Sequence, residues 1–376
     1  MRVGILGAGA VALAHAALAA SRGHEVALWS PSGQSLPPPG GFLLAATGAL
    51  EGRYSVQSAS LTNTMDGAQA VIISLPAYGH ADVMQIAAPH IAEGQPVFVM
   101  PSLSLGGLLL AKLLHARGVR APVVSVGTTV ATARRLAFNH EMLGTPGTAE
   151  EVPGKTDVVC AVQLLSVRTR LDLAATPASA TNAMLTLARA LFGDCFVPQT
   201  DALAIALSNV NPISHVPLAL ANLSRIEAAE GWTQYDRMTG STARMIEALD
   251  AERLAVARSF GLTVRSIHEH FHHSFGVPMA NLDAQSRAVH ASIGSPAGPT
   301  SLASRYLTED VPFGLAFIAW LGLRNGIAVP VTNGCVALAS AALGRDLAAE
   351  NKLLEMAGVD SLPATALLAA ARDGFV

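Results

Sequence analysis

The sequence predicts an α/β protein with an N-terminal doubly wound parallel sheet followed by an all-α C-terminal domain. Three features predict it: a glycine-rich turn after the first apolar run, short apolar runs alternating with helical stretches in the first half, and long apolar helices in the second. At roughly 100–200 residues per domain, 376 residues form two domains, which we place at 1–195 and 196–376. The net charge of -3 and hydrophobic content of 51% exclude a basic nucleic-acid binder and a disordered chain.

The first element is a strand that leads through glycines into a helix. The apolar run Arg2–Leu6 precedes an alanine-rich stretch that ends near Ser21, and between them stands Gly7-Ala8-Gly9-Ala10-Val11-Ala12. This is the GxGxxA form of the Rossmann fingerprint in its strand–turn–helix context. Gly7 would allow the tight turn, Gly9 the approach of backbone to a pyrophosphate, and Ala12 the packing of helix on strand. We expect a dinucleotide to bind at Gly7, Ala8, Gly9, Ala10 and Val11.

The end of the second strand, Glu25–Trp29, carries information about the cofactor. NAD enzymes usually place Asp or Glu here to hold the ribose 2′-hydroxyl, whereas this chain has Ser30-Pro31-Ser32. No carboxylate would repel a 2′-phosphate, and the hydroxyls of Ser30 and Ser32 could bond to it. No arginine follows the strand, although a strong NADP site normally has one. We expect NADP, with NAD as the alternative.

Further strands are expected at 71–75, 96–100, 123–126 and 158–164, and an irregular Pro/Gly-rich loop at 31–41. Ligands bind beyond the carboxyl ends of such strands, which adds Leu75 and Pro76 to the cofactor site.

Helical signals dominate from Thr200 onward. We expect Thr200 to cap the first helix, and Asn211-Pro212 to begin another with Asn as the cap. Further helices are expected from Ser241 to Gly261 and over 312–323 and 333–349.

A nicotinamide enzyme needs a group that moves a proton. Lysine occurs only at 112, 155 and 352, which disfavours a lysine-based mechanism. His215 is the candidate that remains, because Pro217 would interrupt any helix there and leave the imidazole beside irregular backbone. The alternative for His215 is a buried residue satisfied by hydrogen bonds.

The segment Arg305-Tyr306-Leu307-Thr308-Glu309-Asp310 places three charges between apolar stretches. It is either a solvated helix start or a carboxylate that orients His215 with an arginine that binds a substrate carboxylate. The cluster His268-Glu269-His270-Phe271-His272-His273 departs from the His-Glu-x-x-His pattern, so we expect a packed or solvated helix end and no metal.

Together, GxGxxA, Asn211-x-x-x-His215 and Arg305-Tyr-x-x-Glu-Asp-Val-Pro-x-Gly resemble the opine dehydrogenases of the octopine/nopaline type over essentially the whole chain. The resemblance implies an all-helical second domain, similar to that of 6-phosphogluconate dehydrogenase, and a catalytic dyad of His215 and Asp310. It also implies that Arg305 binds a product carboxylate and that Asn211 and Thr128 lie at the substrate site.

Two departures from the family pattern matter. The family usually has His-Pro, where this chain has His215-Val216-Pro217. It often has Gly-Glu-Thr after the strand near 126, with the Glu facing a cationic amino acid, where this chain has Gly127-Thr128-Thr129. Arginine is therefore an unfavourable amino donor.

We expect an NAD(P)H-dependent oxidoreductase that condenses an amino acid with a 2-oxo acid. The alternatives are a His-dependent 2-hydroxyacid or polyol dehydrogenase, and a non-catalytic NADP-binding protein. Three widely spaced cysteines and glycines inside the N-terminal apolar run favour the cytoplasm over export. We expect neither a membrane nor a nucleic acid as partner, and a homodimer is a candidate assembly.

Overall fold

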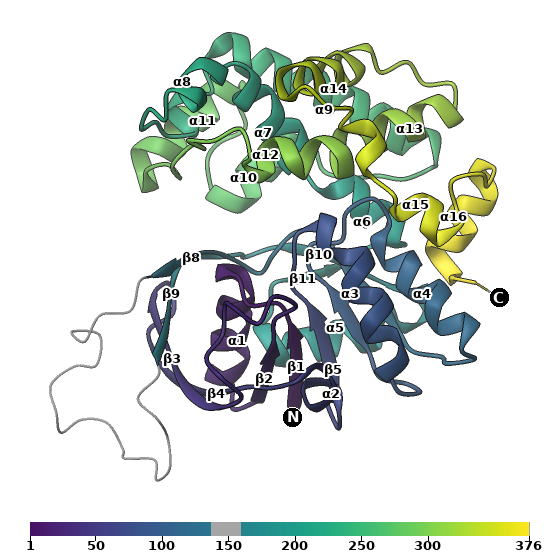
Figure 1. Cartoon of the computed structure of the whole chain (residues 1–376). Coiled ribbons are helices and arrows are strands. Elements are labelled where there is room, and N and C mark those ends of the chain that lie inside the picture. Colours follow the sequence, from purple (N-terminus) through teal and green to yellow (C-terminus); the bar gives the residue numbers. More distant parts are fainter. Residues whose placement is uncertain (137–158, 376) are drawn as a thin grey trace, which may run out of the picture. The chain divides into compact units, whose positions relative to one another are not determined.

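The computed structural model describes residues 1–136 and 159–375, and these divide into two compact units (Figure 1). The sheet unit consists of Met1–Ser102, Gly107–Thr200 and Arg372–Val376, and the helical unit of Leu103–Gly106 and Asp201–Ala371.

The sheet unit is built on one mixed sheet in the order β11-β10-β7-β6-β5-β1-β2-β4-β3-β9-β8. Pairing is parallel except between β3 and β4, β7 and β10, and β8 and β9. The strands are β1 (Arg2–Leu6), β2 (Glu25–Trp29), β3 (Gly40–Gly48), β4 (Gly52–Ser58), β5 (Ala70–Ile73), β6 (Val97–Val99), β7 (Val123–Val126), β8 (Ala131–Leu136), β9 (Val159–Val167), β10 (Leu171–Thr176) and β11 (Phe196–Pro198).

The predicted fold class is confirmed, and several strands lie where the apolar runs place them. The strands β1, β2 and β7 have the expected bounds. Strand β9 continues to Val167, beyond the expected end at 164, and the expected first residue, Val158, lies outside the described residues. The expected loop at 31–41 ends two residues early, at Pro39, because β3 begins at Gly40. The strands β3, β4, β8, β10 and β11 were not predicted.

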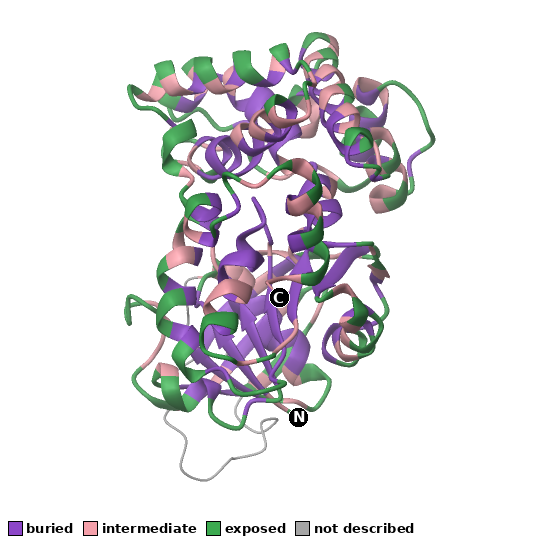
Figure 2. Cartoon of the chain, turned by 90° about the vertical axis from the view of Figure 1, so that its right-hand side faces the viewer, coloured by how far each residue is buried: buried purple, intermediate pink, exposed green. Residues whose placement is uncertain are grey.

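Helix α1 (Ala10–Ser21) is buried on nearly all sides. Every residue from Ala12 to Ala19 is buried, because β3, β4, β8 and β9 contact the helix in addition to β1 and β2 (Figure 1). Small alanines allow that close packing, and a helix apolar all round belongs inside a core. Figure 2 shows the strands of this unit as largely buried. The remaining α-helices of the unit are α2 (Leu61–Met65), α3 (His80–Ala87), α4 (Gly106–Ala116) and α5 (Thr181–Phe192).

The helical unit consists mainly of helices, as expected, although several of them were not predicted individually. The helices are α6 (Ala202–Ser208), α7 (Asn211–Leu220), α8 (Leu223–Glu227), α9 (Gly240–Ser259), α10 (Ile267–Phe275), α11 (Leu282–Ile293), α12 (Arg305–Thr308), the π-helical η6 (Val311–Leu315), α13 (Ala316–Arg324), α14 (Pro330–Leu343), α15 (Leu353–Ala357) and α16 (Ala364–Asp373). Helix α14 ends at Leu343 rather than 349, because Gly344 takes a left-handed φ of 65°.

Three local predictions in this unit were wrong. The cap of α6 is Asp201, whose carboxylate accepts the Ala204 N–H at 2.8 Å, rather than Thr200. Asn211 is the first residue of α7 rather than its cap, and its own N–H donates to Asn209 Oδ1 at 2.9 Å. Pro217 does not interrupt α7, which continues to Leu220. The loss of one helical hydrogen bond is outweighed there by the burial of the apolar face of the helix.

The stretch Ala202–Leu220 has the length and the mean hydropathy, 1.3, of a segment that could cross a membrane. Because 72% of it is buried inside the structure, it also has the character of a core helix, which passes the same test.

Candidate active site

The glycine-rich turn has the backbone that the fingerprint requires. Gly7 takes a φ of +140°, and a Cβ there would stand 2.3 Å from the Ser74 carbonyl oxygen, so no side chain fits. The Gly7 N–H donates to the Trp29 carbonyl at 2.8 Å, which ties the turn to the end of β2. Ala12 is fully buried behind the turn. The turn therefore lies at the carboxyl ends of β1 and β2, where β5 adjoins β1 on the other side.

The start of α1 fits a dinucleotide phosphate. Gly9 is exposed, and a Cβ there would meet nothing within 4 Å, so the space in front of the backbone is open. Gly9 is the N-cap of α1 and supplies no side-chain cap, which leaves the N–H groups of the first turn to a ligand. Ala10 and Val11 are half-buried at this end of the helix. A helix N-terminus of this kind attracts phosphate through its N–H groups and dipole.

Two more predicted cofactor segments lie at neighbouring strand ends. After β2, Ser30 Oγ and Ser32 Oγ are 3.3 Å apart. After β5, the Leu75 carbonyl is 3.0 Å from His80 Nε2, and Pro76 begins a short 3₁₀ turn. Leu75 and Pro76 are half-buried. Neighbouring strands thus place these residues and the glycine turn at one edge of the sheet.

Two histidines behind this edge are neutral structural groups. His15 of α1 is 3.1 Å from Ser74 Oγ through Nδ1, and its Nε2 accepts the Val130 N–H at 3.4 Å. Both His15 and His80 are fully buried, and burial lowers the pKa of each imidazole to about 4. Sequence reasoning passed over His15, because a lone histidine in an alanine-rich helix carries no signal of its partners.

In the helical unit, His215 and Asp310 form a hydrogen-bonded pair. His215 Nδ1 lies 2.8 Å from Asp310 Oδ2, and the two side chains are 12% and 6% exposed. The carboxylate is an acceptor, so it selects the tautomer that carries the proton on Nδ1. That leaves Nε2 as the ring nitrogen that can exchange a proton with a ligand. The contact joins α7 to the residue that precedes η6, 95 positions away.

The close approach of α7 to η6 depends on a glycine and a proline. A Cβ at Gly314 of η6 would stand 2.2 Å from Pro212 Cγ, so only glycine fits against the first turn of α7. Both residues are buried. A single π-helical turn is uncommon and is often found at functional sites. Here it directly follows Asp310.

Tyr306 is a third member of this cluster, and sequence reasoning assigned it no role. Its ring stacks on the His215 imidazole with centroids 3.9 Å apart and planes within 4°. Burial raises the pKa of the Tyr306 phenol above its usual range, so its hydroxyl stays protonated. Tyr306 and Asp310 are four residues apart, and residues at that spacing share one face of a helix. This spacing could have predicted that Tyr306 and Asp310 contact the same side chain.

The other predicted substrate residues lie at different points. Asn211 is half-buried on α7, one helical turn before His215 and therefore on its face. Arg305 is exposed on α12, next to Tyr306. Thr128 is half-buried after β7 and belongs to the sheet unit. The structure thus groups Asn211, Arg305, His215 and Asp310 within the helical unit.

The histidine-rich segment is packed into helix α10. His268 Nδ1 is 3.1 Å from Gln285 Oε1, and His272 Nδ1 is 2.8 Å from the Val277 carbonyl. Ser266 and Glu269 form a capping box at the start of the helix. Within residues 1–136 and 159–375, no three His, Cys, Asp or Glu side chains gather as a metal site would require.

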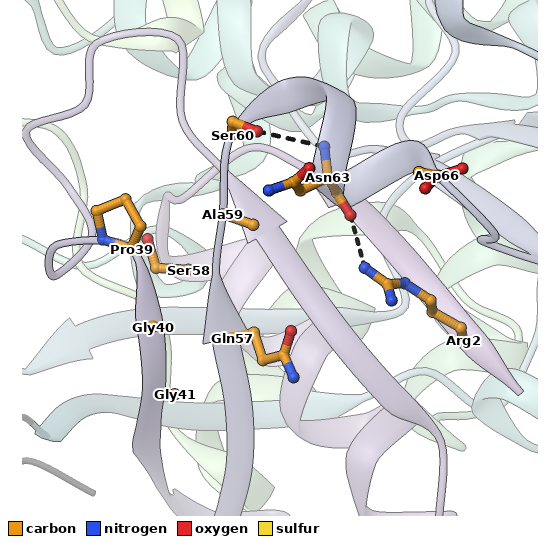
Figure 3. Close-up of a pocket in the computed structure, with 10 residues that line it drawn as sticks. All are labelled: Arg2, Pro39, Gly40, Gly41, Gln57, Ser58, Ala59, Ser60, Asn63 and Asp66. Atoms are coloured by element: carbon orange, nitrogen blue, oxygen red, sulfur yellow. Dashed lines mark hydrogen bonds between the residues drawn. The ribbon is translucent and has the colours of Figure 1, made fainter.

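The sheet unit also has a hollow of 810 Å³ beside α2, shown in Figure 3. Its lining includes Arg2, Gln57, Ser58 and Asn63, and it shares no residue with the predicted site.

The chain is similar to known proteins over nearly its whole length. Residues 198–343 match the family described as NAD/NADP octopine/nopaline dehydrogenase, alpha-helical domain. Over 371 residues, 97% of each chain, the protein is 28% identical to an opine dehydrogenase of Arthrobacter sp. (strain 1C). Octopine dehydrogenase with NADH and L-arginine has a similar fold, with a TM-score of 0.74, 19% identity and coverage of 98% of this chain and 97% of the other. Yersinopine dehydrogenase with NADP+ has a TM-score of 0.70, 17% identity and coverage of 97% and 99%. The chain is therefore similar to opine dehydrogenases over nearly its whole length, and its residues 198–343 match the helical domain of the octopine/nopaline dehydrogenases.

Proposed function

We propose that the protein is an NAD(P)H-dependent opine dehydrogenase that joins an amino acid to a 2-oxo acid. The amine nitrogen of one bonds to the carbonyl carbon of the other, and the carbonyl oxygen leaves as water to give an imine. Hydride addition to the imine carbon and protonation of the nitrogen then give a secondary amine dicarboxylic acid. The observation that carries the proposal is the His215–Asp310 pair, held at 2.8 Å in the helical unit of a chain with a dinucleotide-binding turn.

His215 handles the proton in this reaction. In the oxidative direction its Nε2 accepts a proton from the substrate amine, and in the reductive direction it returns one to that nitrogen. Asp310 holds Nδ1–H and stabilises the imidazolium that forms, and Tyr306 keeps the ring in its plane. A nicotinamide cofactor bound at the glycine-rich turn would supply the hydride that reduces the imine and would accept a hydride in the reverse reaction.

The substrates are small carboxylates, and we assign Arg305 and Asn211 to them. The exposed guanidinium of Arg305 can bind a carboxylate with two hydrogen bonds. Thr128 stands where a carboxylate would attract a cationic amino acid, so neutral or apolar amino donors are favoured over arginine. Arginine as the best donor would show that another acidic residue binds the guanidinium.

For the cofactor we propose a preference for NADP over NAD. Support comes from Ser30 and Ser32, which put two hydroxyls and no carboxylate at the end of β2. Ser30→Asp should reverse the preference by charge repulsion, as measured by the Kd values of both cofactors. Wild-type protein that binds NADH at least about tenfold tighter than NADPH would contradict the proposal.

The deciding experiment follows the oxidation of NADPH and NADH while crossing 2-oxo acids with amino acids. Turnover that needs both substrates supports an opine dehydrogenase. Turnover with a 2-oxo acid alone would identify a 2-hydroxyacid dehydrogenase instead. Cofactor binding without turnover across the whole screen would identify a non-catalytic NADP-binding protein.

We further propose a cytoplasmic location and a homodimer. The three cysteines are buried free thiols, as suits a reducing compartment. Leu323 and Leu338 of α13 and α14, 83% and 61% exposed, offer apolar surface for a second copy. Light scattering of the purified protein tests the assembly, and a monomer would contradict it.

A further inference from the structure

A guanidinium lies beside the glycine-rich turn although no arginine follows β2 in the sequence. Arg135 is on β8, where it pairs with Val162 of β9, and its side chain is exposed. Its Nη1 donates to the Ala8 carbonyl at 3.2 Å and to the Ser35 carbonyl at 2.8 Å. Ala8 belongs to the turn that would hold the pyrophosphate, and Ser35 to the loop that begins at Ser30. Arg135 thus bridges the two segments that border the adenosine ribose in proteins of this fold.

The Nε and Nη2 groups of Arg135 are suited to bind a phosphate. Among the described residues, the only other polar contact of Arg135 is a weak one from Nη2 to Cys160 Sγ at 3.8 Å. The edge formed by Nε and Nη2 is the fork with which arginine binds phosphate oxygens in pairs. The hydroxyls of Ser30 and Ser32, 3.3 Å apart, lie on the same loop as Ser35 and add donors that are short and uncharged.

We propose that Arg135, together with Ser30 and Ser32, forms the subsite for the 2′-phosphate of NADP. The inference rests on the proposed dinucleotide site, and it names the residue that sets the choice between NADP and NAD there. An alternative is a purely structural bond, in which Arg135 only ties the loop to the turn. The two differ in outcome: a structural tie affects both cofactors equally, whereas a phosphate subsite affects only NADP.

The test measures binding to the protein without substrates. Wild type, Arg135→Gln and Arg134→Gln are titrated with NADP+ and NAD+ by calorimetry. Arg134 is the matched control, because it is also exposed and neighbouring residues of a strand point to opposite faces. We expect Arg135→Gln to weaken NADP+ binding by about 10- to 100-fold, the range for a charge-assisted hydrogen bond, and to leave NAD+ within about threefold. Arg134→Gln should change neither.

Two further measurements keep the result decisive. Adenosine 2′,5′-bisphosphate and AMP differ only in the 2′-phosphate, and the same selective loss should appear for the bisphosphate. Arg135→Lys keeps the charge without the fork, so it should show a smaller loss for NADP+ alone, and it stands in if the Gln variant fails to fold. An equal loss for NADP+ and NAD+, or no loss for NADP+, would overturn the inference.

The outcome is separable from that of the proposed reaction. A selective loss of NADP+ binding in a protein that turns over no amine and oxo-acid pair would support the subsite and reject the reaction. Turnover with a normal NADP+ affinity in Arg135→Gln would support the reaction and reject the subsite. Wild type that binds neither cofactor would overturn both.

Discussion

The candidate sites of the two units are formed by different kinds of groups. In the sheet unit the candidate pyrophosphate site is made of backbone, from the glycine turn and the start of α1, and His15 and His80 are buried nearby as neutral packing groups. In the helical unit it is made of side chains, with His215 held between a carboxylate and a ring. The surroundings of an imidazole therefore decide whether it is a structural or a chemical group. Each prediction below tests one side of that contrast.

The largest expected effect is at the side-chain site. His215→Ala should lower turnover by about 10²–10⁴, the usual range for a positioned acid–base group, with the Kd for the cofactor unchanged. Asp310→Asn should cost less, because it keeps the shape of the residue while removing its charge. Arg305→Ala should mainly raise KM for a carboxylate substrate.

Steady-state kinetics of the single and double variants provide the measurement. The double variant should be little worse than His215→Ala, because groups that act as a unit are not additive. Fully additive losses, or near wild-type turnover in His215→Ala, would return His215 to the structural class of His15.

The buried histidines, His15 and His80, should instead affect how the free energy of unfolding depends on pH. The unfolded chain protonates them below their ordinary pKa of 6.5, whereas the folded protein does so only near 4. The free energy of unfolding should therefore be flat above pH 6.5 and fall between pH 6.5 and 4, by up to about 3 kcal/mol for each histidine. Urea unfolding across this range measures the slope. His80→Gln should reduce the slope by about half, because His15 remains, whereas the exposed His90→Gln should leave it unchanged. An unchanged slope in His80→Gln would contradict the assignment.

Substitutions at Gly9 and Gly7 should have different effects: the first should weaken cofactor binding, and the second should lower the stability of the fold. Gly9→Val enters open space, so the free energy of unfolding should stay within about 0.5 kcal/mol while cofactor Kd rises by about 10- to 100-fold. Gly7→Ala should lower stability by about 1–3 kcal/mol, because its Cβ meets the Ser74 carbonyl. Fluorescence titration and chemical unfolding measure the two effects. Normal cofactor binding in Gly9→Val would remove the start of α1 from the site.

Removing the ring over His215 should have the smallest effect. Tyr306→Leu loses the stacking and the cation–π attraction to the imidazolium, which is typically about 0.5–2 kcal/mol, so kcat should fall by about 2- to 30-fold. Tyr306→Phe keeps the ring and should stay near wild type. An equal loss of kcat in Tyr306→Phe and Tyr306→Leu would mean that the Tyr306 hydroxyl, rather than its ring, is responsible for the effect.

The same contrast explains which parts of the two sites could be predicted from the sequence. Gly7 and Gly9 were predictable, because their roles depend on backbone conformation within a few residues. The contacts of Tyr306 with His215 and of Arg135 with Ala8 were not, because each joins distant parts of the chain, 127 positions apart in the second case. Strand β8 was missed for a related reason: Arg134 and Arg135 interrupt its apolar pattern, and among the described strands β8 pairs only with β9, at the edge of the sheet.

The short segment Leu103–Gly106 has a consequence for anyone who recombines this protein with a relative. It lies in the sequence of the first half, yet it groups with the helical unit, where Ser104 Oγ donates to the Phe313 carbonyl at 2.5 Å and accepts from Asn351 Nδ2 at 2.8 Å. A chimera with a single crossover at 200 would separate Ser104 from the π-helical turn that it bonds. Exchange of the helical unit should therefore carry residues 103–106 along and leave Arg372–Val376 with the sheet.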